Sequence, residues 1–182
     1  MRPSPQHSLV AAPPPSASFD DAYRAHYDDV RRFLHRLGAR GADLPELVQE
    51  CFVTALKRWN TFDPTRAARP WLFGIAFRVH ADFRARARHG SEVLETFDAP
   101  ASGDDPERTV AGQQRAVLFQ RALATLDETK RATFLLHFGE GLSPAELAEA
   151  LELPIATIYT RLRTARLELT EAVKRLEGGR HE

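Results

Sequence analysis

The side chains best suited to bind another molecule lie near the C-terminal end of the chain, where hydroxyl groups and arginines recur at helical spacing. They are Thr157, Tyr159, Thr160, Arg163, Thr164 and Arg166. Arginine can donate two parallel hydrogen bonds to guanine in the major groove, and hydroxyl groups can bond to bases or phosphates. This combination favours DNA binding, although an ordinary helical hairpin with a solvated arginine face would show the same pattern.

Two helices joined by a tight turn must position these side chains. Ser143 and Glu146 form a Ser-x-x-Glu capping box with Pro144 at the first helical position, which predicts a helix start. Pro154 disfavours helical geometry in the residue before it, so a second helix begins near Ile155. The apolar residues of both helices recur at helical spacing: Leu147, Ala148, Leu151, Ile158, Leu162, Ala165 and Leu169. The pattern is typical of a helix-turn-helix that binds the major groove.

The sequence shows no arrangement of side chains suited to catalysis or metal binding. The histidines between residues 26 and 137 lack metal-ligand spacing: His26, His35, His80, His89 and His137. Cys51 is the single cysteine, which excludes an internal disulfide framework and a multi-cysteine metal site. It lies within an apolar stripe, as a small core residue rather than a nucleophile. Without a nucleophile–base pair or a phosphate-binding glycine loop, we expect no enzyme activity, no catalytic residues, no cofactor and no metal.

The charge of the chain is balanced overall but unevenly distributed. Its 182 residues include 25 basic and 25 acidic ones. Residues 66–90 contain six arginines and one aspartate, whereas residues 91–108 contain six acidic residues and one arginine. A basic block beside an acidic one indicates a local electrostatic footprint next to a solvated linker. The net charge of zero therefore does not exclude nucleic-acid binding.

The composition indicates a soluble globular protein, with 43% hydrophobic and 27% charged residues. No stretch is long and apolar enough to span a bilayer. Residues 1–18 include five prolines and lack the apolar core of a signal peptide. We therefore expect a disordered tail on a cytoplasmic protein that does not insert into the membrane.

Three helices are predicted between Ser18 and Arg88. The first begins at Ser18 and ends at Gly38, and the second begins with Asp43 as its cap. The apolar stripe of the second helix is Leu44, Leu47, Val48, Cys51, Phe52, Ala55, Leu56 and Trp59. The third helix begins near Pro70, and its buried stripe is Trp71, Leu72, Ile75, Ala76, Val79 and Phe83.

Phe73 and Phe77 fall outside the predicted stripe of the third helix, among its arginines. Basic groups there could bind phosphates, and the aromatic rings could stack on unpaired bases. A solvated arginine face with a second packing surface would explain the same residues. This helix alone does not decide between the two interpretations.

The remaining segments complete an all-α fold class. Residues 89–112 lack a sustained period and are rich in Pro, Gly, Ser and acidic residues, which indicates a linker. Two further helices are predicted at 113–126 and 128–138, the latter with Ala132, Leu135, Leu136 and Phe138 on its apolar face. The predicted order is a tail at 1–18, a helical domain at 19–88, a flexible acidic linker at 89–112 and a helix-turn-helix domain at 113–177.

Four segments together resemble bacterial sigma factors of the extracytoplasmic-function (ECF) group, over nearly all of residues 19–176. ELVQECF (46–52) resembles the helix segment that docks core RNA polymerase, and FDPTRAARPWLFGIAFRVHADFRAR (62–86) resembles the stretch that captures and melts the −10 promoter element. ALATLDETKRATFLLHFGEGLSPAELAEAL (122–151) resembles the start of the second domain. LPIATIYTRLRTARLEL (153–169) resembles the helix-turn-helix that reads the −35 element.

The resemblance implies a role for three sets of residues. The polymerase-docking set is Leu47, Gln49, Glu50 and Phe52, of which Leu47 and Phe52 are also core candidates. The set for the −10 element is Arg66, Arg69, Trp71, Arg78, Arg84 and Arg86. The set for the −35 element is Thr157, Tyr159, Thr160, Arg161, Arg163 and Arg166.

The chain departs from the family pattern at four of its positions. Glu46 replaces a more usual Asp and keeps its charge, and Arg78 stands where Asn is common, so base contacts there are in doubt. Glu152 stands where the turn usually has Gly, which we interpret as a less strained turn. Tyr159 stands where Lys or Arg is common, which removes one phosphate contact and could alter sequence preference.

The resemblance predicts a sigma factor that binds core RNA polymerase and directs promoter recognition and melting. Its partners would be core polymerase and promoter DNA, with an anti-sigma factor left open. Two other classes of protein remain as alternatives. A stand-alone helix-turn-helix regulator would bind a palindromic site as a dimer without polymerase. A sigma-like protein that titrates an anti-sigma factor would bind no promoter.

Overall fold

The computed structural model describes residues 18–90 and 110–178, and every regular element in these ranges is helical. The all-α fold class that the sequence predicts is therefore confirmed for the described part of the chain. The proline-rich tail and most of the predicted acidic linker lie outside the described residues.

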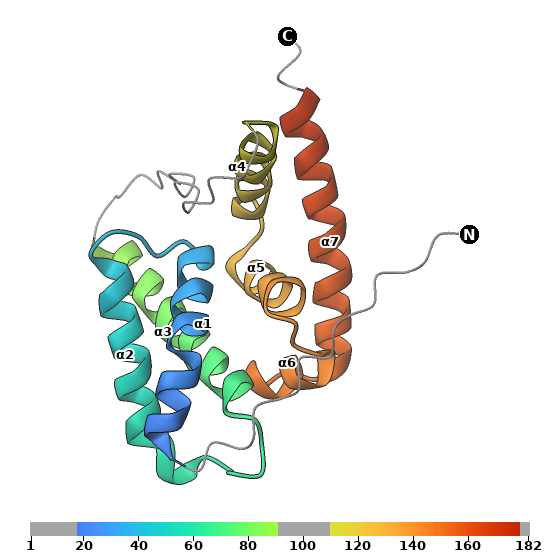
Figure 1. Cartoon of the computed structure of the whole chain (residues 1–182). Coiled ribbons are helices and arrows are strands. Elements are labelled where there is room, and N and C mark those ends of the chain that lie inside the picture. The colour runs from blue at the N-terminus through green and yellow to red at the C-terminus, as the bar shows by residue number, and fades with distance from the viewer. Residues whose placement is uncertain (1–17, 91–109, 179–182) are drawn as a thin grey trace.

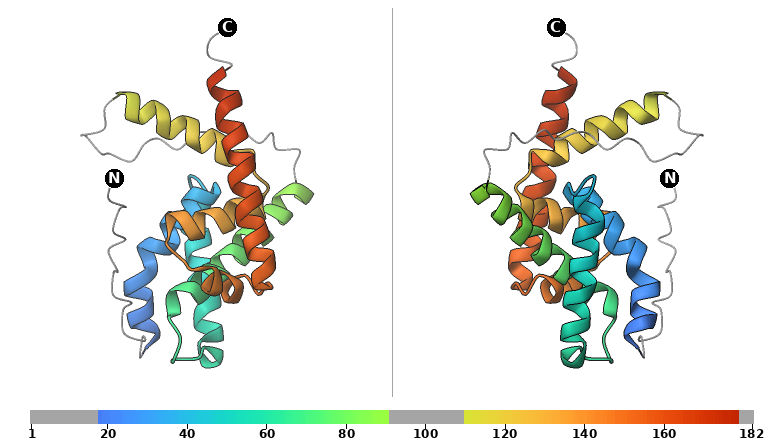
Figure 2. Two further views of the ribbon diagram at one scale, coloured as in Figure 1. Left: turned by 90° about the vertical axis from the view of Figure 1, so that its right-hand side faces the viewer. Right: turned by 90° about the vertical axis from the view of Figure 1, so that its left-hand side faces the viewer.

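Two groups of helices lie side by side (Figure 1). The first helical group contains α1 (Phe19–Leu37), α2 (Asp43–Arg58), η1 (Trp59–Thr61) and α3 (Ala68–Gly90). The second helical group contains α4 (Val110–Ala124), α5 (Glu128–Phe134), the π-helical turn η2 (Leu135–Gly139), α6 (Pro144–Ala150) and α7 (Ile155–Gly178). Contacts of α3 with α6, and of α1 with α5 and η2, join the two groups, and both views of Figure 2 place α6 against α3.

Helix α1 begins and ends where its capping residues predict. The side chain of Ser18 accepts a hydrogen bond from the backbone N–H of Asp21, which satisfies one of the free donors of the first turn. Gly38 ends the helix at φ +122°, and its N–H donates to the carbonyls of Leu34 and His35. Glycine adopts this backbone geometry without the steric cost that a Cβ would impose.

Helix α2 corrects two sequence predictions. Asp43 is its first helical residue rather than its cap, and Ala42 before it offers no side-chain hydrogen bond. The stripe from Leu44 to Ala55 is buried, but Leu56 is 56% exposed. Helical spacing places Leu56 beyond Phe52 at the edge of the stripe, outside the arc that α1 and α3 cover.

Helix α3 is buried on more sides than a single stripe predicts. Phe73, which we expected outside the stripe, is fully buried, and its ring packs edge-on against Phe33 with centroids 5.3 Å apart. Phe77 is partly buried against the same core. Helices α1 and α2 cover one side of α3 while α6 covers another, so residues between these contacts are enclosed as well. The ring of Phe73 is therefore not available to stack on a base.

The second helical group contains an irregular turn that moves one predicted core residue outward. Ala132, Leu135 and Leu136 are buried as expected, whereas Phe138 is 54% exposed. The backbone N–H of Glu140 bonds to the carbonyl of Leu135, the five-residue spacing of a π-helix. This wider turn changes the helical register after Leu135, so Phe138 leaves the face that regular helical spacing predicts.

Helices α6 and α7 have the start and buried faces that the sequence predicts, but not the turn. Ser143 and Glu146 form the expected capping box, and the buried face of α7 includes Ile158 and Leu162. Between the helices, Glu152 has φ +54°, and no other non-glycine residue in the described ranges has a positive φ. The expectation of a less strained turn is wrong, because this left-handed geometry is the one that favours glycine.

Candidate nucleic-acid interface

A cluster of aromatic rings fixes the loop that precedes α3. Trp59 stacks on Phe62 with ring centroids 4.8 Å apart, and Trp71 lies 5.0 Å from Phe62 and 5.8 Å from Trp59. Aromatic pairs at these distances stabilise a fold by more than the burial of their apolar surface alone would. Trp71, one of the residues that we expected at the −10 element, therefore contacts this loop directly through Phe62.

A cavity of about 350 Å³ lies between this loop and α6. Rings and arginines of the first helical group line it: Phe62, Trp71, Arg66 and Arg78. Carboxylates of the second helical group line it too: Glu146, Glu149 and Glu152. Aromatic faces beside arginines suit an unpaired base and its phosphate, because every base can stack and every phosphate is an anion. In this structure the arginines face carboxylates instead.

Arg66 and Arg78 both form ion pairs with the second helical group. Arg66 Nη1 lies 3.5 Å from Glu149 Oε2. Arg78 Nη1 lies 3.2 Å from Glu152 Oε1 and donates to the backbone carbonyl of Ala150 at 3.4 Å. Arg78 thus binds the C-terminal end of α6, where the unpaired carbonyls of a helix carry partial negative charge.

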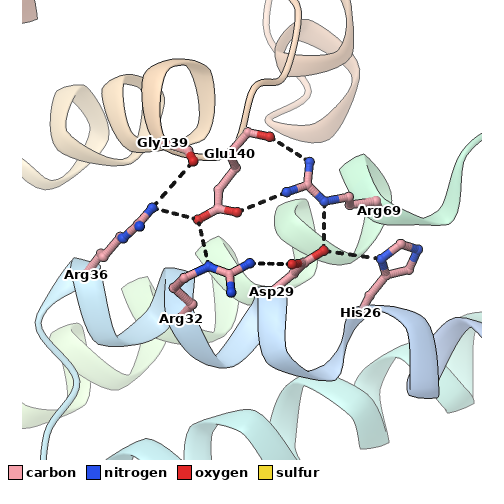
Figure 3. A network of polar contacts seen from close by, with 7 residues as sticks. All are labelled: His26, Asp29, Arg32, Arg36, Arg69, Gly139 and Glu140. Atoms are coloured by element: carbon pink, nitrogen blue, oxygen red, sulfur yellow. Dashed lines mark hydrogen bonds and ion pairs between the residues drawn. The ribbon is translucent and has the colours of Figure 1, made fainter. Parts of the chain in front are cut away.

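Arg69 belongs to a denser network that is centred on Glu140 (Figure 3). It donates to Asp29 Oδ2 at 2.9 Å, to Glu140 Oε2 at 2.9 Å and to the Glu140 carbonyl at 2.7 Å. Arg36 donates to Glu140 Oε1 at 2.9 Å, and Arg32 lies 3.8 Å from the same oxygen while it also pairs with Asp29. The Glu140 side chain is only 2% exposed, so this carboxylate from the second group sits among three arginines of the first.

Burial and charge act in opposite directions on the two carboxylates of this network. Burial raises the pKa of Glu140 above its ordinary value, against the lowering effect of the arginine charges. Burial would also raise the pKa of Asp29, but the hydrogen bond and charge of Arg69 outweigh it and lower that pKa. Burial lowers the pKa of His26, which lies 3.5 Å from Asp29.

The outer part of α3 makes a separate contact with the second group. His80 is 3% exposed, and its Nδ1 donates to Glu128 Oε1 at 2.7 Å. This hydrogen bond lowers the pKa of Glu128, with a further contribution from the charge of Arg84. Arg86 lies 3.4 Å from Glu50 on α2. Of the arginines that we expected at the −10 element, Arg66, Arg69 and Arg78 therefore contact the second group, whereas Arg86 pairs within the first.

Helix α7 presents part of its predicted polar face to solvent. Tyr159, Thr160, Arg163 and Arg166 are exposed, whereas Thr157 and Arg161 are half-buried. Thr160 donates its hydroxyl proton to the carbonyl of Ala156 at 2.9 Å, so its oxygen remains free only to accept. Arg161 Nη1 is buried without a hydrogen-bond partner. Of the three arginines predicted on this face, Arg163 and Arg166 are therefore the two whose side chains are exposed to solvent.

Helix α2 divides the predicted docking residues between core and surface. Leu47 and Phe52 are buried, Glu50 is half-buried and Gln49 is exposed. Val53 and Leu56, at 42% and 56% exposure, continue the open face from Gln49. The spacing 49, 53 and 56 could have identified this face from the sequence.

Comparison with known proteins places the chain in a family. The model of Sigma-70 region 2 matches residues 22–89, and that of Sigma-70, region 4 matches residues 116–169. The ECF RNA polymerase sigma factor RpoE of Cereibacter sphaeroides is 31% identical over 150 residues, covering 82% of this chain and 82% of that protein. The chain belongs to the ECF RNA polymerase sigma factors.

Solved structures have the same fold as this sigma factor. The sigma factor RpoE in complex with the anti-sigma factor NepR from Bartonella quintana has a TM-score of 0.70 at 22% identity, covering 86% of this chain and 96% of that one. CnrH in complex with the cytosolic domain of CnrY has a TM-score of 0.63 at 24% identity, covering 86% of this chain and 87% of that one. At these identities the likeness establishes the fold alone.

The region 2 match spans α1–α3 of the sigma factor, and the region 4 match lies within α4–α7. Sigma factors are transcription initiation factors. In the described ranges, no helix combines the length and apolar character that crossing a membrane requires. Within those ranges we also find no group of three or more His, Cys, Asp or Glu residues that could hold a metal ion.

Sequence reasoning missed the acidic partners of the region 2 arginines. Glu140, Glu149 and Glu152 lie in the second helical group, more than 70 positions along the chain from Arg66 and Arg69. No local pattern in the sequence indicates such a pairing. The one available signal is Glu152 at a turn position that favours glycine.

Proposed function

We propose that this sigma factor directs core RNA polymerase to promoters through three surfaces. The open face of α2 docks polymerase, the arginines and rings around α3 capture the −10 element, and the polar face of α7 reads the −35 element. The observation that carries the proposal is the division of α7 into a buried apolar face and an exposed face with Arg163 and Arg166, directly after a capped helix and a tight turn. This is the geometry by which a recognition helix enters the major groove.

The proposed melting surface uses stacking and charge rather than catalysis. Flipping a base from a duplex costs a few kcal/mol, and stacking on an aromatic ring returns ~1–3 kcal/mol per base. Phe62 and Trp71 offer rings at the cavity, and Arg66 and Arg78 offer charges for the adjoining phosphates. Capture of an unpaired base there can therefore offset much of the cost of opening the promoter.

The proposed docking surface combines polar and apolar groups on α2. Gln49 and Glu50 supply hydrogen-bonding groups, and the neighbouring Val53 and Leu56 supply exposed apolar area. Leu47 and Phe52 support this face from the core, because both are buried beneath it. Exposed apolar side chains bordered by polar ones are typical of protein–protein contacts.

An anti-sigma factor is a further proposed partner. It is supported by the two similar solved structures, the sigma factor bound to NepR and CnrH bound to the cytosolic domain of CnrY. We infer a cytoplasmic location from the proposed binding to core polymerase and promoter DNA. A stand-alone regulator would instead bind a palindrome as a dimer without polymerase, and a titrating protein would bind no promoter.

Replacing Arg163 with alanine tests the recognition surface. A good bidentate contact between arginine and guanine discriminates by ~1–3 kcal/mol, so Arg163→Ala should weaken recognition of the −35 element by about 5- to 100-fold. Affinity for core polymerase should not change, because Arg163 belongs to α7 and the proposed docking surface belongs to α2. Arg175→Ala, an exposed position near the end of the same helix, is the matched control. The measurement is binding of the reconstituted holoenzyme to promoters with and without the −35 element. Loss of polymerase binding in Arg163→Ala would contradict the assignment.

A further inference from the structure

We propose that the free sigma factor inhibits itself, because carboxylates of the second helical group occupy the arginines that would bind the −10 element. The inference rests on the proposed function of those arginines. Arg66, Arg69 and Arg78 each contact a glutamate of the second group: Glu149, Glu140 and Glu152 respectively. An arginine whose donors hold a carboxylate cannot give the same donors to a phosphate. The closed arrangement and −10 binding therefore exclude one another.

Glu140 is the central contact of the closed arrangement. Its carboxylate is 2% exposed and receives hydrogen bonds from Arg36 and Arg69, with Arg32 nearby (Figure 3). A buried carboxylate is tolerated only where opposite charges and hydrogen bonds replace water. These partners all come from the other helical group, so Glu140 is satisfied in this position only while the groups are together. Its environment thus favours the closed state over one in which the arginines are withdrawn.

Arg78 makes a second contact that requires close backbone approach. A Cβ added at Gly74 would lie 2.2 Å from the carbonyl oxygen of Ala150, so only glycine permits α6 to approach α3 this closely. At that point Arg78 holds both the Ala150 carbonyl and the Glu152 carboxylate. Glu152 keeps a strained left-handed backbone in a turn where glycine would relax it, and its carboxylate meets Arg78. The close contact, the strain and the ion pair occur together at this one junction.

His80 and Glu128 extend the junction along α3. Their hydrogen bond of 2.7 Å joins α3 to α5, two residues beyond Arg78 in the sequence, and His80 is 3% exposed. Four separate polar contacts, centred on Glu128, Glu140, Glu149 and Glu152, therefore hold the second group against α1, α3 and the loop between α2 and α3. Promoter binding requires that these contacts break, and docking on polymerase supplies the binding energy to separate the groups.

Gly74→Ala opens the junction without removing any charge. The added methyl group meets the backbone of Ala150, which cannot turn aside as a flexible side chain can. Within the first group the methyl group would lie 3.2 Å from Arg78 Nη2, the end of a flexible side chain, so α3 itself has room to fold. Glu140→Gln weakens the closed state by a different route, since it removes the charge that three arginines surround. Gly178→Ala, where a Cβ would meet nothing within 4 Å, is the matched control.

The experiment compares these full-length variants with the unmodified chain in the absence of polymerase. Small-angle X-ray scattering measures compactness, and fluorescence anisotropy measures binding of a single-stranded −10 oligonucleotide. If about one molecule in ten is open, removing the closed state raises the apparent affinity about tenfold. We expect Gly74→Ala and Glu140→Gln to expand the chain and bind the oligonucleotide about tenfold more tightly, and Gly178→Ala to match the unmodified chain.

Two results would overturn the inference: an unmodified chain as expanded as Gly74→Ala, or an expanded variant whose affinity for the oligonucleotide is unchanged. The second result is interpreted together with a separate measurement, promoter opening by holoenzyme that contains Arg69→Ala. That measurement tests the proposed role of Arg69 independently of the self-inhibition. If Arg69→Ala impairs promoter opening by polymerase, the proposed function stands and only the self-inhibition fails. If Arg69→Ala has no effect there, the proposed function of the α3 arginines fails as well.

Discussion

At the turn between α6 and α7, glycine and alanine should rank oppositely in stability at two nearby positions, Glu152 and Glu149. Glu152 has φ +54°, and a left-handed conformation costs an L-residue about 1–2 kcal/mol. Glycine avoids that cost but loses about 0.5–1 kcal/mol more than alanine through the entropy of the unfolded chain. Glu152→Gly should therefore be more stable to unfolding than Glu152→Ala by about 0.5–1 kcal/mol. Both variants lack the ion pair with Arg78, so the difference between their free energies of unfolding reports the backbone strain alone.

Glu149 is the matched position, because it is exposed within α6 and has no positive φ. There the order should invert, with Glu149→Gly less stable than Glu149→Ala by about 1 kcal/mol, the usual penalty for glycine inside a helix. Urea unfolding followed by circular dichroism at 222 nm measures all four free energies of unfolding. Finding Glu152→Ala as stable as Glu152→Gly would refute the assignment of strain to this turn.

Two further predictions concern α2. Val53→Asp, at an exposed position, should weaken binding to core polymerase about tenfold or more while the free energy of unfolding changes by less than about 0.5 kcal/mol, as measured by binding titration and urea unfolding; unchanged polymerase affinity would exclude this face from the docking surface. Burial, with a smaller effect of Glu50, raises the pKa of the Cys51 thiol to about 12, so the folded protein should not react with a thiol reagent at pH 8 and should react once it is unfolded in urea. A native thiol that reacts as fast as the unfolded one would contradict the buried position of Cys51.

The helices whose boundaries depend on adjacent residues could be predicted from the sequence. Ser18 and Ser143 cap their helices through hydrogen bonds three residues away, so both signals are local. The buried face of α7 follows from the spacing of Ile158 and Leu162 alone. These features need no knowledge of the rest of the fold. The family resemblance, and the sigma factor assignment that the comparisons bear out, also came from ordered segments of the sequence.

The remaining features depend on contacts between distant segments. Phe73 is buried because α6 and the first group enclose α3 from several sides, which a single helical stripe cannot express. Phe138 is exposed because a π-helical turn changes the register of its helix. The pairing of Arg69 with Glu140 joins residues 71 positions apart. Composition indicated an arginine-rich surface, but only the structure shows that this surface is covered by carboxylates of the same chain.

The central claim is that this chain gives core RNA polymerase its choice of promoter. The direct measurement is transcription in vitro from a promoter library by core polymerase, with and without the purified protein, followed by sequencing of the 5′ ends of the transcripts. We expect start sites that depend on the protein and lie downstream of a shared pair of sequence elements, one for each helical group. Identical start sites with and without the protein would contradict it.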